Sequence, residues 1–218
     1  MPQAAAQEEP LITQKKLEFV LLLLCAAALV VSGIGPFDRL TWFLEVWPVM
    51  LGLPLLVLTS GRFPLSFLVY VLLFVHALIL LVGGHYSYAN VPLGFWLQDV
   101  FDFTRNHYDR IGHLAQGFIP ALLAREILVR TSPLKGSRWL PFLVVCFCLA
   151  FSALYELLEW AAAVVLGEGA DEFLGTQGDP WDTQTDMFLA LSGAVASLLL
   201  LSKWHDRSMA RLTAAVGR

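Results

Sequence analysis

The feature that most constrains this sequence is a series of apolar runs long enough to cross a lipid bilayer. A membrane-spanning helix needs about 20 mostly apolar residues, because it must cross about 30 Å of hydrocarbon. We expect such helices at Leu17 to Ile34, Trp42 to Thr59, Pro64 to Val82, Ile111 to Val129, Trp139 to Leu166 and Met187 to Trp204. The sequence therefore predicts an all-α, polytopic membrane protein with six transmembrane helices.

Composition agrees with this fold class. Of the 218 residues, 57% are hydrophobic and only 15% are charged, which is too apolar for a water-soluble core to hide. The lipid bilayer is therefore the expected partner. No basic cluster interleaved with aromatic residues is present, so nucleic-acid binding is not expected.

The distribution of Lys and Arg predicts the orientation, because cytoplasmic loops of membrane proteins carry an excess of these residues. With six spans, one side of the membrane receives only Arg39, Arg105 and Arg110. The other side receives Lys15, Lys16, Arg62, Arg125, Arg130, Lys135, Arg138, Lys203, Arg207, Arg211 and Arg218. Both termini are therefore predicted to be cytoplasmic, in the inner membrane of a bacterium. Residues 1–16 are expected to form a disordered cytoplasmic tail, 17–204 the transmembrane domain and 205–218 a second cytoplasmic tail.

Three pairs of ionisable residues lie on these runs or at their ends. An ionisable side chain deep in the membrane costs about 2.5 to 3.5 kcal/mol on insertion scales unless it is paired or hydrated, so it indicates a functional site. Spacings of three or four residues place the members of each pair on one helix face: Asp109 with His113, Glu156 with Glu159, and Asp182 with Asp186.

These pairs are predicted to share one depth near the outer face of the membrane. The fourth and sixth runs begin at that face, and the fifth run ends there. A single ring of these side chains is therefore geometrically possible, and His76 and His85 are open candidates for an additional member. As metal ligands we predict His113, Glu156, Glu159, Asp182 and Asp186, and as catalytic residues Asp109, Glu156 and Glu159.

Such a ring has three chemical uses. Carboxylates with imidazole bind divalent metal ions, which activate water for hydrolysis. Without a metal, crowded carboxylates and a histidine suit a proton relay in a transporter. The third use is structural, with buried acids paired to Arg105 or Arg110. Asp179 and Asp182 also suit a helix start, because Pro180 fits the first helical position and acids favour the first turn.

Other polar and small residues have plainer interpretations. His76 lies alone in an apolar run and more often represents a satisfied core histidine. Cys25, Cys146 and Cys148 lie within the apolar runs and are expected to be small core residues rather than disulfides. Gly117 and Gly193 predict close contacts between helices.

Three segments carry a resemblance to a known family. They are Tyr108 to Phe118 (YDRIGHLAQGF), Tyr155 to Trp160 (YELLEW) and Phe173 to Met187 (FLGTQGDPWDTQTDM). The chain resembles the YjdF-type family of bacterial inner-membrane proteins from about Leu17 to Lys203. It is more distantly similar to VanZ-like membrane proteins, from which it differs by Glu159 in place of a glutamine and by a longer outer loop. The resemblance implies a family rather than a reaction.

Two functions remain open from the sequence. The first is a metal-dependent membrane enzyme that acts on a lipid or lipid-linked envelope substrate. The second is a small proton- or cation-coupled transporter. Few polar residues lie in the inner halves of the spans, which favours the enzyme.

Overall fold

The computed structural model describes residues 2–167, 171–174 and 176–216, and the side chains of 14–167, 173–174 and 176–214. All regular elements in these residues are helices. They are α1 (Pro2–Ser32), α2 (Arg39–Ser60), α3 (Phe67–Tyr86), the 3-10 turn η1 (Tyr88–Asn90), α4 (Pro92–Phe101), α5 (Tyr108–Thr131), α6 (Trp139–Leu166), α7 (Asp171–Leu174) and α8 (Asp182–Val216). The predicted all-α class is confirmed.

Within the described residues, four helices are long and apolar enough to cross a membrane: α2, α3, α6 and α8 up to Ala214. The multi-span architecture is therefore confirmed, whereas six spans and cytoplasmic termini remain predictions. The predicted division into two tails and one transmembrane domain also remains a prediction, and α1 begins at Pro2 while α8 continues to Val216.

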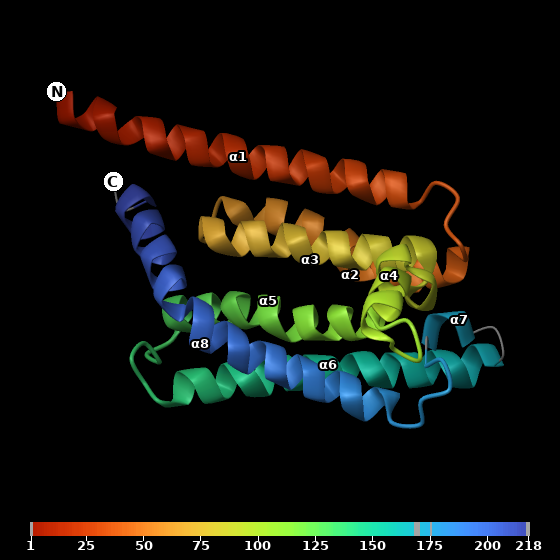
Figure 1. Ribbon diagram of the computed structural model, residues 1–218. Coiled ribbons are helices and arrows are strands. Elements are labelled where there is room, and N and C mark those ends of the chain that lie inside the picture. Colours follow the sequence, from red (N-terminus) through yellow and green to blue (C-terminus); the bar gives the residue numbers. More distant parts are fainter. Residues whose placement is uncertain (1, 168–170, 175, 217–218) are drawn as a thin grey trace.

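The helix α5 is more polar than its neighbours, and other helices surround it. It packs against α3 on one side and against α6 and α8 on the other, while α1 packs on α2 and α3 (Figure 1). Polar side chains at membrane depth are tolerated when they face the interior of a bundle. The surroundings of α5 thus explain how its acids, arginines and histidine can lie inside an otherwise apolar protein.

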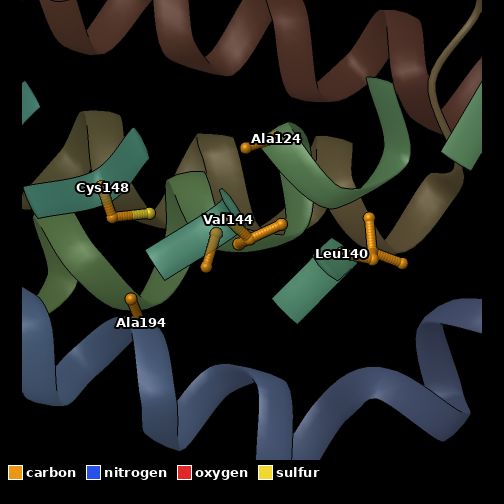
Figure 2. Packing of buried hydrophobic residues seen from close by; sticks show 6 residues of the cluster. Ala124, Leu140, Val144, Cys148 and Ala194 are labelled. Atoms are coloured by element: carbon orange, nitrogen blue, oxygen red, sulfur yellow. The ribbon is translucent and has the colours of Figure 1, made fainter. Parts of the chain in front are cut away.

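Each half of the bundle has its own cluster of buried apolar side chains. One lies between α1, α2 and α3 and contains Cys25, Val46, Val49, Ala77 and Leu81. The other joins α5, α6 and α8, and Figure 2 shows Ala124, Leu140, Val144, Cys148 and Ala194 within it. Cys25 and Cys148 are buried as predicted, whereas Cys146 is exposed, so its predicted core position is wrong.

The helices α5 and α8 cross in very close contact. A side-chain carbon added at Gly117 would clash with the carbonyl oxygen of Ala190, and one added at Gly193 would clash with that of Leu114. Small residues allow membrane helices to approach in this way. The predicted contacts at both glycines are therefore confirmed, and they fix α5 against α8 between two polar ends.

Candidate metal centre

Three helices meet at the end of the bundle opposite the chain termini (Figure 1). The first turns of α5 and α8 and the last third of α6 bring together a group of ionisable side chains that we name the His113 cluster. It consists of Asp109, His113, Glu156, Glu159 and Asp186. The predicted ring is present for these five residues.

The imidazole of His113 lies at the centre of this cluster and is 5% exposed. Its Nε2 lies 3.5 Å from Oδ1 of Asp109, 3.8 Å from Oε1 of Glu156 and 3.9 Å from Oδ2 of Asp186. These distances are too long for strong hydrogen bonds. One nitrogen thus faces carboxylates from three different helices.

The other ring nitrogen of His113 has a defined partner. Nδ1 lies 3.2 Å from Oε1 of Gln116, one turn further along α5. With the amide oxygen of Gln116 as the acceptor, Nδ1 is the ring nitrogen that donates. In the neutral imidazole, Nε2 then presents a lone pair to the carboxylates, which is the orientation that metal-binding histidines adopt.

Glu156 and Glu159 approach the same histidine from α6. Single ligand atoms of His113, Glu156 and Glu159 all lie within 4.8 Å of one another, and the same holds for Asp109, His113 and Asp186. Glu156 and Asp186 are 6% and 2% exposed. Each keeps one buried oxygen without a hydrogen-bond partner among the described residues, Oε1 of Glu156 and Oδ1 of Asp186. Buried polar atoms are normally satisfied, so these two indicate room for a cation or proton.

Asp182 has another partner. Arg105 donates a hydrogen bond of 2.6 Å to its Oδ1, and Arg110 donates one of 3.0 Å to Oδ2 of Asp179. The structural use predicted for these acids is therefore realised at Asp182 and Asp179. The predicted role of Asp182 as a metal ligand stays a prediction, and the groups that could hold a metal do not include it.

The segment before α8 differs in detail from the predicted helix start. Pro180 and Trp181 form a turn, and the helix begins at Asp182. Asp179 accepts a hydrogen bond of 3.0 Å from the backbone N–H of Trp181. That N–H, together with Arg105 and Arg110, lowers the pKa of Asp179.

His107 lies next to these arginines, and its neutral form is favoured. Burial, and then the neighbouring guanidinium groups of Arg110 and Arg105, lower the pKa of His107. The loop outside the His113 cluster therefore favours ionised Asp179 and neutral His107 at neutral pH. It is a paired, structural region.

Sequence reasoning missed two residues beside the cluster. Tyr155 on α6 donates a hydrogen bond of 2.9 Å to Oε2 of Glu45 on α2, and Glu45 is 4% exposed. The ring of Tyr155 also stands edge-on to that of His113. The sequence did contain a signal, because Glu45 is an acid inside an apolar run.

Neither His76 nor His85 belongs to the cluster. His76 lines a cavity of about 610 Å³ between α1, α2 and α3, whose wall is mostly apolar. Nδ1 of His85 lies 2.9 Å from the carbonyl oxygen of Ser32. The structure does not realise the option that one of them is an additional member of the ring, because His76 lines this cavity and His85 contacts α1.

A second polar cluster, which the sequence did not predict, lies toward the other end of α5 and α8. Glu126 and His205 are both fully buried there. Glu126 accepts hydrogen bonds from the backbone N–H of Ser66 (2.8 Å), from Arg130 (2.8 Å) and from Nε2 of His205 (2.9 Å). We name it the Glu126 cluster, with members Ser66, Arg125, Glu126, Arg130, His205 and Asp206.

The comparisons with known proteins agree with a membrane location. The family described as "Predicted membrane protein (DUF2238)" matches residues 17–207. The chain is also 51% identical over 189 residues to the inner membrane protein YjdF of Escherichia coli (strain K12), which covers 87% of this chain and 90% of that protein. No solved structure matches. The predicted resemblance and the inner-membrane, multi-pass localisation are therefore confirmed.

Proposed function

We propose that this chain, which belongs to the DUF2238 family of membrane proteins, is a metal-dependent enzyme that acts on a lipid or lipid-linked substrate. The observation that carries the proposal is the arrangement at His113. Its Nδ1 proton is held by Gln116, and its Nε2 faces the carboxylates of Asp109, Glu156 and Asp186.

This arrangement requires a positive charge. A neutral imidazole with its lone pair directed at carboxylates is electrostatically unfavourable in a site shielded from water. Either a second proton on His113 or a divalent cation relieves it. The cation is favoured because Glu156 and Asp186 each keep one oxygen without a hydrogen-bond partner among the described residues. Such atoms are the ligands that divalent ions use.

The residues suggest a hydrolytic role for the site. A bound divalent ion would lower the pKa of a water ligand and so supply a nucleophile. In this scheme Nε2 of His113 and carboxylates of the His113 cluster would hold the ion, and Asp109 and Glu159 are the more exposed members of the cluster. Glu159 or Asp109 is then the group placed to accept a proton from the attacking water.

The surroundings of the site favour a substrate that arrives from the bilayer. The short helix α4 lies at the same end of the bundle and exposes Phe95, Trp96 and Phe101 (Figure 1). Trp160 and Trp181, on α6 and before α8, are also exposed. Tryptophan and other aromatic side chains gather at the boundary between lipid and water. The His113 cluster would therefore lie near lipid headgroups.

A proton- or cation-coupled transporter is the second candidate. The observation in its favour is the buried pair of Glu126 and His205 at the far end of the same two helices, which would serve as the opposite end of a path. The close crossing at Gly117 and Gly193 lies between the two ends and opposes a continuous path along α5 and α8. The enzyme is therefore the better supported function.

Metal analysis of the purified protein tests the proposal. We expect one or more divalent ions per chain, and a lower metal content in His113→Ala. Asp99→Asn is the matched control, because Asp99 is an exposed acid on α4 outside the cluster. It should keep the full content. A protein that binds no divalent ion even after incubation with Mn²⁺, Fe²⁺ or Zn²⁺ would exclude the metal-dependent enzyme.

A further inference from the structure

We propose that the His113 cluster binds two divalent cations side by side, Mn²⁺ or Fe²⁺ by the nature of its ligands, and not a single ion. This inference rests on the proposed function. Sites built from carboxylates and imidazole suit Mn²⁺ and Fe²⁺, whereas sites built from thiolates select zinc or copper. Pairs of ions about 3.5 to 4 Å apart are a common arrangement in enzymes that cleave phosphate esters and peptides.

The first argument is charge. Asp109, Glu156, Glu159 and Asp186 together carry four negative charges when ionised, and neutral His113 adds none. One divalent ion would leave two negative charges uncompensated in a largely buried site, whereas two ions leave none. Uncompensated charge is costly inside a membrane protein. The balance therefore favours two ions.

The other acids nearby do not disturb this count. Asp182 forms an ion pair with Arg105 and Asp179 forms one with Arg110. Glu45 accepts a hydrogen bond from the hydroxyl group of Tyr155. Glu45 also lies outside both groups of possible metal ligands, so the four acids of the His113 cluster are the ones that a bound cation would contact.

The second argument is the number of ligand sets. Two sets of residues bring their ligand atoms within 4.8 Å of one another, and both sets contain His113. One lone pair binds one ion, and the Nδ1 proton of His113 is held by Gln116. Only one ion can therefore use the imidazole. The protein ligands of the other ion must then all be carboxylates.

The free oxygens suggest how the two ions share their ligands. Asp109, His113 and Asp186 form the first set, and His113, Glu156 and Glu159 form the second. Oε1 of Glu156 lies 3.8 Å from Nε2 of His113 and has no hydrogen-bond partner within the described part of the chain. Glu156 belongs to the second set and lies beside the imidazole that both sets contain, so we assign it as the carboxylate shared by the two ions.

Titration of metal-free protein with Mn²⁺ tests the inference. We expect two Mn²⁺ per chain by elemental analysis and a spin-coupled electron paramagnetic resonance signal at full loading. One Mn²⁺ per chain with an uncoupled signal would overturn the inference and leave the proposed function standing. Absence of binding would overturn both.

Two single variants test the assignment of ligands. Asp109→Asn and Glu159→Gln each remove one carboxylate from a different set, so each should bind one Mn²⁺ and lose the coupled signal. Asp99→Asn should still bind two. If both variants also bind two coupled ions, neither acid is a ligand and the assignment of ligands is refuted. Thermal melting of each variant shows whether it is folded, and the stoichiometry of the unmodified protein decides the matter if one is not.

Discussion

The same two helices, α5 and α8, carry a polar cluster at each end, and the two clusters differ in how their charges are satisfied. In the Glu126 cluster, a buried carboxylate receives hydrogen bonds from an arginine, a histidine and a backbone N–H. In the His113 cluster, carboxylates outnumber their donors, and oxygens of Glu156 and Asp186 have no partner among the described residues. The first cluster is complete as it stands, whereas the second requires a cation or protons.

The two histidines show the same difference. Arg125 lies 3.1 Å from Nδ1 of His205 and can only donate, so the proton of His205 sits on Nε2 and points to Glu126. His113 has the reverse tautomer, with its proton on Nδ1 toward Gln116. His205 donates a hydrogen bond to Glu126 and so links α8 to α5. A histidine that turns a lone pair toward acids is placed to bind a metal ion.

Removal of the central acid of the complete cluster should have the largest effect. We expect Glu126→Ala to destabilise the protein by about 3 to 5 kcal/mol, because it leaves the buried imidazole of His205 and the buried backbone N–H of Ser66 without their partner. Thermal melting in detergent measures this loss. A change of less than about 1 kcal/mol would mean that the Glu126 cluster does not hold α3, α5 and α8 together.

Disruption of the contact between α5 and α8 at Gly117 should cause the second-largest loss of stability. Gly117→Ala adds a methyl group against the backbone of Ala190, which should cost about 1 to 3 kcal/mol as α5 and α8 move apart. It should also weaken Mn²⁺ binding, because Asp109 and Asp186 lie on the two separated helices. Gly52→Ala is the control, since its added carbon meets nothing. Equal stability of both variants would refute the tight crossing.

Replacement of an acid in the His113 cluster by its neutral amide should raise the stability of the metal-free protein instead of lowering it. In the metal-free protein, Asp186→Asn should raise stability by about 1 kcal/mol, because it removes a buried charge that lacks a partner. In the presence of Mn²⁺ the same substitution should lower stability relative to the unmodified protein. Destabilisation in both conditions would mean that Asp186 is satisfied without metal.

The loop outside the His113 cluster should give the smallest effect. The folded protein lowers the pKa of Asp179 below its ordinary value of 3.8, so the ion pairs of Asp179 stabilise the protein above that pH. This contribution should disappear as the pH falls through the lower, folded value. Asp179→Asn should therefore flatten the stability profile below about pH 4. If the variant and the unmodified protein lose stability equally below about pH 4, Asp179 has no role in holding the loop.

The sequence predicted the parts of the molecule that depend on local spacing. The apolar runs located the four described helices that are long and apolar enough to cross a membrane, and the four-residue spacing of Asp109 and His113 placed both on one face of α5. The joining of three helices in one cluster required a further argument from depth in the membrane, and the structure brings those residues together.

The sequence could not predict the partners that come from distant positions. Glu126 meets His205 across 79 residues and Asp182 meets Arg105 across 77, and no spacing rule connects such residues. The result is that Glu126 was not assigned and Asp182 was expected among the metal ligands. Charge alone did not separate an acid with a partner from one without.

Anomalous X-ray scattering from crystals grown with Mn²⁺ would compare the two clusters most directly. We predict anomalous density between His113, Asp109, Glu156 and Asp186, and none beside Glu126 and His205. Density at Glu126, or none at His113 despite saturating Mn²⁺, would contradict the assignment of the incomplete cluster as the metal centre.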